Sequence, residues 1–121
     1  MGRFGEFFRG LRASRGLSLR GFCLANGFDP GNISRLERGV LPPPESREKL
    51  ETYAKALRLK KGSDDWYTFF DLAAAERGRI PEDVLSDVEL VNRLPVLFRT
   101  LRGQRVDDEA LDDLVERIRR A

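Results

Sequence analysis

The chain has 121 residues, of which 40% are hydrophobic and 35% are charged, and its formal net charge is +2 at pH 7. This length allows one compact domain with a core and a small appendage, and it excludes two large domains. Cys23 is the only cysteine and there is no histidine, which excludes a disulfide framework and argues against a structural zinc site.

Helical periodicity predicts an all-α fold, because no segment alternates β-branched or aromatic residues with polar ones over the length of a strand. The first predicted helix runs from about Arg3 to Ser14 and ends at Arg15-Gly16. Its expected buried side consists of apolar residues at helical spacing, namely Phe4, Phe7, Phe8 and Leu11.

The segment from Leu17 to Pro44 is the most informative, because its start and stop signals predict two short helices joined by a tight turn. The first helix begins after Ser18 and breaks at Asn26-Gly27. The second begins after Asp29 and ends before Gly39. The apolar residues expected on the buried side of this pair are Leu19, Phe22, Cys23, Phe28, Ile33 and Leu36.

Further helices are predicted after the triple proline at residues 42–44, which cannot lie inside a helix. A fourth helix follows it, and a fifth begins after the N-cap Ser63 and ends at Gly78. Their expected buried stripes are Leu50, Tyr53, Ala54 and Leu57 in the fourth helix and Trp66, Phe69, Phe70 and Ala73 in the fifth. Two short helices, bent or restarted at Pro95, and a final helix over about residues 108–119 complete the prediction.

Charge is distributed unevenly along the chain. Residues 1–61 contain 13 Lys and Arg against 6 Asp and Glu, a net charge of +7, whereas residues 62–121 contain 9 against 14, a net charge of −5. The basic first half favours binding to a polyanion, and the alternative is chance asymmetry in a highly charged surface.

The second short helix carries side chains that suit a DNA major groove. We expect its N-terminal residues Pro30, Gly31, Asn32 and Arg35 to reach base edges. Asn32 can offer a donor and an acceptor to adenine, and the guanidinium of Arg35 matches the two acceptors of guanine. Gly31 would permit close approach of the backbone. By themselves these residues also fit an ordinary solvated helix surface.

Glycine, apolar and acidic positions occur here in the order and spacing of one known family. They are Gly16-Leu17-Ser18, Phe22-Cys23, Gly27, the string ISRLERG at residues 33–39 and the prolines that follow. The pattern resembles the Xre, or Cro/CI, family of helix-turn-helix regulators with the lambda-repressor-like fold, over about residues 4–77. The resemblance implies a five-helix DNA-binding domain over residues 1–78, followed by a C-terminal helical extension over residues 79–121.

The same resemblance implies roles for further polar residues. The expected phosphate contacts are Ser18, Arg20, Ser34, Arg38 and Lys49. Arg12 and Glu37 are expected to form a structural ion pair between the first and third helices. Leu19 departs from the family pattern, since several members have a polar DNA-contacting residue there. Cys23 takes a position that is commonly alanine, and we expect it to pack in the core rather than act as a redox switch.

The expected function is therefore a transcriptional regulator, a repressor that binds double-stranded DNA and inserts its third helix into the major groove. An antitoxin that binds a toxin and represses its own operon is the alternative. The expected partners are a palindromic operator and a second copy of the chain, with residues 79–121 as the dimerisation region. Packing of this extension onto its own domain and capture of a toxin are the other options for it.

Several functions are not expected. The chain has no histidine and no nucleotide-binding glycine pattern after a strand, so we predict that it is not an enzyme. No cofactor and no metal are expected, because the acidic residues between positions 107 and 116 form a solvated helix face. No apolar run approaches the roughly 20 residues that span a bilayer, and we expect a cytoplasmic protein without a membrane anchor.

Overall fold

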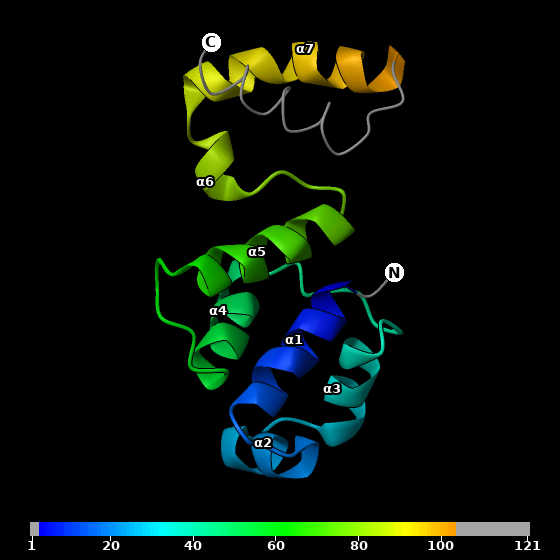
Figure 1. Ribbon diagram of the computed structural model, residues 1–121, viewed down its shortest axis with the longest axis vertical. Helices are drawn as coiled ribbons and strands as arrows, with labels where there is room; N and C mark the ends of the chain where they lie inside the picture. The colour runs from blue at the N-terminus through cyan, green and yellow to red at the C-terminus, as the bar shows by residue number, and fades with distance from the viewer. Residues whose placement is uncertain (1–2, 104–121) are drawn as a thin grey trace. The chain divides into compact units, whose positions relative to one another are not determined.

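A computed structural model describes residues 3–103, which contain helices and loops but no strand (Figure 1). The predicted all-α class is thus confirmed for this part of the chain. The chain divides into two compact units, and the boundary between them lies between Ile80 and Pro81. Within residues 3–103, none of the helices combines the length and apolar character needed to cross a bilayer.

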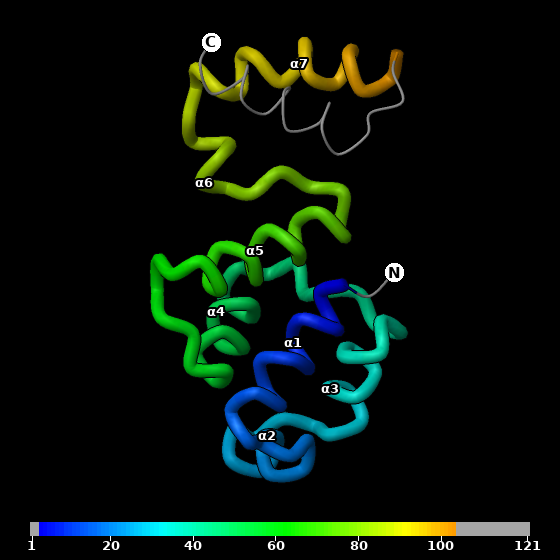
Figure 2. Tube along the Cα trace, viewed as in Figure 1, coloured from blue at the N-terminus to red at the C-terminus, as the bar shows by residue number. Residues whose placement is uncertain are grey.

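The first unit has five helices between residues 3 and 80. They are α1 (Arg3–Ser14), α2 (Leu19–Asn26), α3 (Pro30–Glu37), α4 (Arg47–Ala56) and α5 (Asp64–Glu76). The predicted starts of α2, α3 and α5 are confirmed, because the side chains of Ser18, Asp29 and Ser63 each accept a hydrogen bond from a backbone N–H of the first turn. The tube in Figure 2 shows the short turn that leads from α2 into α3.

Within residues 3–103, Phe8 lies at the centre of a core in which six of the fifteen buried hydrophobic residues are aromatic. It is fully buried, and its ring contacts rings from α1, α2, α4 and α5. The ring centroids lie 6.2 Å away for Phe4, 5.8 Å for Phe22, 5.5 Å for Tyr53 and 6.2 Å for Phe69. Each such pair adds about 0.5 to 1.5 kcal/mol beyond the burial of apolar area. One side chain thereby joins four helices, and α3 packs against the same core through Ile33 and Leu36.

Helices α1 and α3 approach so closely that only glycine fits at one position. A Cβ atom at Gly5 would lie 2.6 Å from the carbonyl oxygen of Glu37 and closer still to that of Leu36. Both obstacles are backbone atoms, which cannot move aside without separating the helices. Sequence patterns do not predict this contact, because Gly5 lies inside a regular helix and its partners are more than 30 positions away in the chain.

The C-terminal end of α5 holds two other parts of the first unit. Glu76 accepts a hydrogen bond at 2.8 Å from the backbone N–H of Phe4, at the start of α1. Arg77 donates from Nε to the carbonyl oxygen of Pro43 at 2.7 Å and from Nη1 to Glu45 at 3.1 Å. The loop between α3 and α4 is therefore fixed both by its buried proline, Pro43, and by Arg77.

The second unit contains α6 (Glu82–Leu85) and α7 (Val88–Gly103) within its described residues, 81–103. The predicted restart of the helix at Pro95 is wrong, because α7 continues through this proline and the interruption lies at Ser86 and Asp87 instead. The helix tolerates the hydrogen bond and the close packing that proline costs it, and it begins after Asp87, whose side chain accepts from the N–H of Leu90 at 3.1 Å and caps the start of α7. The predicted helix over residues 108–119 lies outside the described residues.

Candidate nucleic-acid interface

Helix α3 has two faces of opposite character. Ile33, Leu36 and Glu37 are buried against the rest of the first unit, whereas Asn32 and Arg35 are exposed. Three residues of this eight-residue helix therefore pack against the protein, and two polar residues face the solvent. This arrangement suits a helix that is held firmly from below while its outer side meets a partner.

Three of the four predicted base-contacting residues, Gly31, Asn32 and Arg35, lie close together on α3. The Asn32 N–H donates to Asp29 Oδ2 at 2.9 Å, which caps the helix. The guanidinium of Arg35 donates from Nη2 to Asn32 Oδ1 at 3.0 Å. A Cβ atom at Gly31 would lie 3.5 Å from each terminal nitrogen of Arg35, so this guanidinium lies beside Gly31 as well. Pro30, the fourth candidate, is exposed in the first turn.

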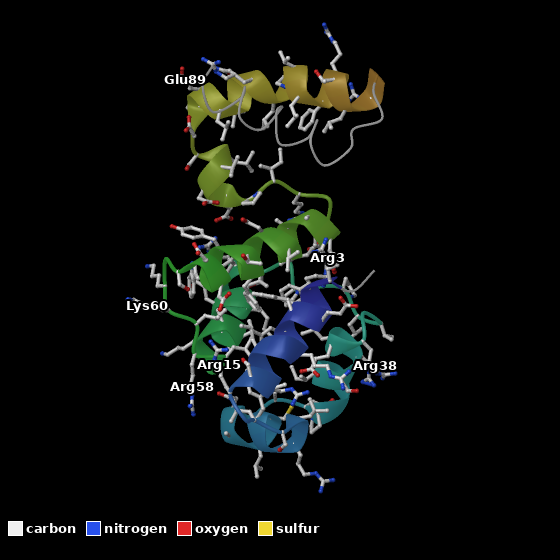
Figure 3. All side chains as sticks on the ribbon, in the orientation of Figure 1. Arg3, Arg15, Arg38, Arg58, Lys60 and Glu89 are labelled. Atoms are coloured by element: carbon white, nitrogen blue, oxygen red, sulfur yellow. The ribbon has the colours of Figure 1, made fainter. Side chains whose placement is uncertain are left out.

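The predicted phosphate contacts are spread over α2, α3 and the start of α4. Ser18 Oγ accepts from the N–H of Gly21 at 3.0 Å, and its hydroxyl proton can still be donated to a phosphate. Arg20 is exposed on α2, Ser34 is half-buried on α3, and Arg38 is exposed where α3 ends (Figure 3). Among residues 3–103, none of these side chains hydrogen-bonds the pair formed by Asn32 and Arg35.

Lys49, the phosphate candidate on α4, lies over two aromatic rings. Its Nζ is 5.0 Å from the ring centroid of Tyr53 and 5.7 Å from that of Phe28, and the two rings pack edge to face at 5.1 Å. Because an ammonium is attracted to the negative faces of aromatic rings, these contacts hold Lys49 beside Phe28, which belongs to the turn between α2 and α3. Sequence spacing could not reveal the contact between Lys49 and Phe28, since these two residues come from different elements.

Arg12 and Glu37 are brought together by α1 and α3. Arg12 donates from Nε to Glu37 Oε2 at 2.7 Å and from Nη2 to Oε1 at 2.9 Å, which is a bidentate ion pair. Arg12 Nη1 also donates to the carbonyl oxygen of Leu17 at 2.7 Å. The side chains are only 11% and 5% exposed. The hydrogen bond with Glu37 raises the pKa of Arg12, and burial opposes this shift. Glu37 therefore faces the protein interior and keeps its negative charge away from the exposed face of α3.

Comparison with known protein families gives a match over most of the first unit. A family model described as a helix-turn-helix domain matches residues 3–64, which is just over half of the chain. The chain belongs to the helix-turn-helix domain family. The match extends from the start of α1 to the start of α5 and so includes both α2 and α3. We found no significant match among curated proteins or among solved structures.

Cys23 is a core residue of the helix-turn-helix domain. It is fully buried, and burial, followed by the charge of Glu37, raises the pKa of its thiol. A thiol with a raised pKa forms little of the reactive thiolate at neutral pH. This environment agrees with a packing role for the side chain. Across residues 3–103, no cluster of His, Cys, Asp and Glu is suited to hold a metal ion.

Two contacts that position the helix-turn-helix domain escaped the sequence analysis. Gly5 sets the distance between α1 and α3, and Arg77 holds the loop that follows α3. Each residue acts on a partner at least 31 positions away in the chain. Neither contact has a local signal in the sequence, because Gly5 and Gly10 lie in the same helix and only Gly5 meets another backbone, and an arginine just after a helix does not indicate its partner.

Proposed function

We propose that this helix-turn-helix protein is a sequence-specific, double-stranded DNA-binding transcriptional repressor of the Xre type, which inserts α3 into the major groove. The observation that carries the proposal is the exposed pair of Asn32 and Arg35 on a helix whose opposite face is buried. Asparagine and arginine are the side chains that most often read base edges, and each good bidentate contact discriminates by about 1 to 3 kcal/mol.

Phosphate contacts on both sides of α3 supply affinity in this proposal. Ser18 and Arg20 lie at the start of α2, where backbone N–H groups and the helix dipole favour an anion. Arg38 and Lys49 follow α3 in the chain, Ser34 lies within it, and Lys49 is held by its aromatic contacts. Such contacts carry no sequence information, and they make binding strongly dependent on salt.

Pro30 and Gly31 make the first turn of α3 compact in the same proposal. Neither residue projects a long side chain, so the backbone can approach the base edges closely. The nearby Asp29 carboxylate is engaged by the N–H of Asn32. The first turn then serves as a spacer that brings Asn32 and Arg35 to the floor of the groove.

The regulator acts as a homodimer on a palindromic operator in this proposal, with its two α3 helices about 34 Å apart, one turn of DNA. We assign dimerisation to the region after residue 78 and place the protein in the cytoplasm. An antitoxin that represses its own operon would use the same DNA-binding face. Light scattering of the full chain over a range of concentrations tests the dimer, and a monomer at every concentration contradicts it.

The decisive experiment is selection of bound oligonucleotides from a random pool by the full chain. We expect one enriched sequence motif with two inverted half-sites. Arg35→Ala should weaken binding to the selected site and change its base preference, whereas Arg20→Ala should weaken selected and random DNA about equally and lower the salt slope by about one. Both variants remove one exposed positive charge, so each controls for the other. Absence of any enriched motif would overturn the proposal.

A further inference from the structure

The end of α4 and the loop after it carry a group of positive charges that the proposed DNA contacts do not use. The exposed cations of this group are Lys55, Arg58, Lys60 and Lys61. Residues 55–61, the basic segment, contain no acidic residue. Leu57 and Leu59 lie between the cations and are buried in the core. The backbone of the basic segment is therefore held in place while its charges face outward.

The four cations have no protein partner within the part of the chain that the structure describes. None of them forms an ion pair or a side-chain hydrogen bond there. Glu51, the nearest acid on the N-terminal side, is engaged by Arg47 at 3.2 Å. Asp64 and Asp65, the nearest on the C-terminal side, lie in the first turn of α5, where the helix dipole stabilises them. The positive charge of the basic segment is thus available to an external anion.

Arg58 has a backbone conformation that the chain gives to glycine elsewhere. Its φ angle is +60°, and it is the only non-glycine residue with a positive φ among residues 3–103. The Arg58 N–H donates to the carbonyl oxygen of Lys55 at 3.0 Å, and the N–H of Leu59 donates to that of Ala54 at 3.0 Å. This pair of hydrogen bonds is the Schellman motif, which ends a helix with a left-handed residue.

Other helices of the first unit end in the same motif with glycine at the left-handed position. The same two hydrogen bonds follow α1, α3 and α5, where the left-handed residues are Gly16, Gly39 and Gly78. A residue with a Cβ atom is strained in this conformation, whereas glycine is not. Arg58 therefore makes the end of α4 less stable than glycine would, and a strained residue of this kind points to a use for its side chain.

The basic segment begins at the end of the first unit where α2 starts. Phe8 of α1 packs against Tyr53 of α4 with ring centroids 5.5 Å apart, and Figure 1 shows both helices running toward α2. Ser18 and Arg20, the predicted phosphate contacts of α2, follow the C-terminal end of α1. Arg58 follows the C-terminal end of α4 and lies at the same end of the unit (Figure 3).

We propose that the basic segment binds phosphates of the DNA that flanks the operator. This inference rests on the proposed function and extends its contacts beyond the base pairs that α3 reads. Phosphate contacts need positive charge and no particular base, so the segment adds affinity and salt dependence but no sequence preference. An acidic protein segment would be attracted to the same charges, but the position of Arg58 near the start of α2 favours the DNA backbone.

The test compares two duplexes that contain the selected operator. The short duplex ends at the edges of the operator, and the long duplex adds about 10 random base pairs, one turn of DNA, at each end. The full chain should bind the long duplex about tenfold more tightly at 0.1 M salt. For each added phosphate contact, the slope of log affinity against log salt concentration should become steeper by about one.

Arg58→Gly is the informative variant, because it should improve one property and weaken another. Loss of the strained side chain should raise the midpoint of thermal unfolding by about 4 °C. Loss of the charge should reduce the advantage of the long duplex about fivefold at 0.1 M salt. Binding to the short duplex should stay the same.

Two control variants separate the charge of Arg58 from its backbone conformation and from its location. Arg58→Lys keeps the charge and should keep the advantage of the long duplex. Arg9→Ala removes an exposed positive charge from α1 and should affect both duplexes equally. Base preference should be unchanged in every variant, because phosphates carry no sequence information.

The outcomes are distinct. Higher stability of Arg58→Gly together with a smaller advantage of the long duplex supports the flanking contact. Equal affinity of the full chain for both duplexes overturns it and leaves the proposed function intact. If poly-L-glutamate then binds the full chain but not Arg58→Gly, the basic segment serves an acidic protein partner instead. Absence of any preferred operator sequence overturns the proposed function, and the flanking contact with it.

Discussion

The two faces of α3 use arginine in opposite ways. On the buried face, Arg12 from α1 makes two hydrogen bonds to Glu37 and one to the backbone of Leu17, so its charge is neutralised inside the protein. On the exposed face, the guanidinium of Arg35 makes a single hydrogen bond to a neutral amide and keeps its full charge for a partner. One short helix thus separates the residues that hold the fold from those that are free to contact a partner.

The largest expected effect is on the buried face, in Arg12→Met. This substitution leaves the Glu37 carboxylate nearly buried without a partner and should destabilise the fold by about 3 kcal/mol. The measurement is chemical denaturation followed by circular dichroism. Arg12→Met combined with Glu37→Leu should recover part of the loss, because it removes the unpaired charge. If the single variant were as stable as the wild type, the ion pair would have no part in holding α3.

Gly5→Ala should have the next largest effect, since it inserts a methyl group between α1 and α3. Displacement of the two helices is expected to cost about 2 kcal/mol. Gly10→Ala is the matched control in the same helix, because a Cβ atom there has no neighbour within 4 Å, and this variant should gain about 0.5 to 1 kcal/mol from helix propensity. Thermal unfolding of the two variants in parallel measures the difference, and equal shifts would contradict the close approach of the helices.

Asp29→Ala tests the cap at the start of α3, the helix that carries both faces. The variant removes the N-cap of α3 and should destabilise the domain by about 1 kcal/mol, while Asp29→Asn, which keeps an accepting oxygen, should stay close to the wild type. Denaturation midpoints give the measurement. A loss of the same size in both variants would mean that the charge, rather than the capping oxygen, stabilises the start of α3.

Arg35→Ala should have the smallest effect on the fold, within about 0.5 kcal/mol of the wild type, because the side chain is exposed. The same variant should lose most of its preference for the selected operator. Unfolding and DNA titrations on one preparation therefore separate stability from recognition. A large loss of stability in this variant would show that the two faces of α3 are not independent.

The local elements could be predicted closely because their signals lie within a few residues of where they act. Ser18, Asp29 and Ser63 each cap a helix through an N–H three positions ahead, and such contacts depend only on neighbouring residues. The same reasoning failed at Pro95. There the general rule that proline ends a helix predicted an interruption, whereas the actual interruption lies beside Asp87, which caps the start of α7.

The long-range contacts could not be predicted in this way. Gly5 meets a backbone 31 positions away, Glu76 caps the start of α1, and Lys49 lies over a ring from the turn between α2 and α3. None of these pairings follows from periodicity or from capping, because each depends on how the helices cross. The pairing of Arg12 with Glu37 was expected only through the resemblance to a known family.

The sequence predicted the helices of the first unit, the approximate ends of α1, α2, α3 and α5, and the apolar sides of these helices, because backbone capping and side-chain burial act over a few residues. Only the tertiary structure decided how closely α1 approaches α3, what holds the loop after α3, and which partner occupies the oxygen of Asn32. Distances between helices depend on the packing of the whole core, and the rotamer of an exposed side chain depends on the room that its neighbours leave.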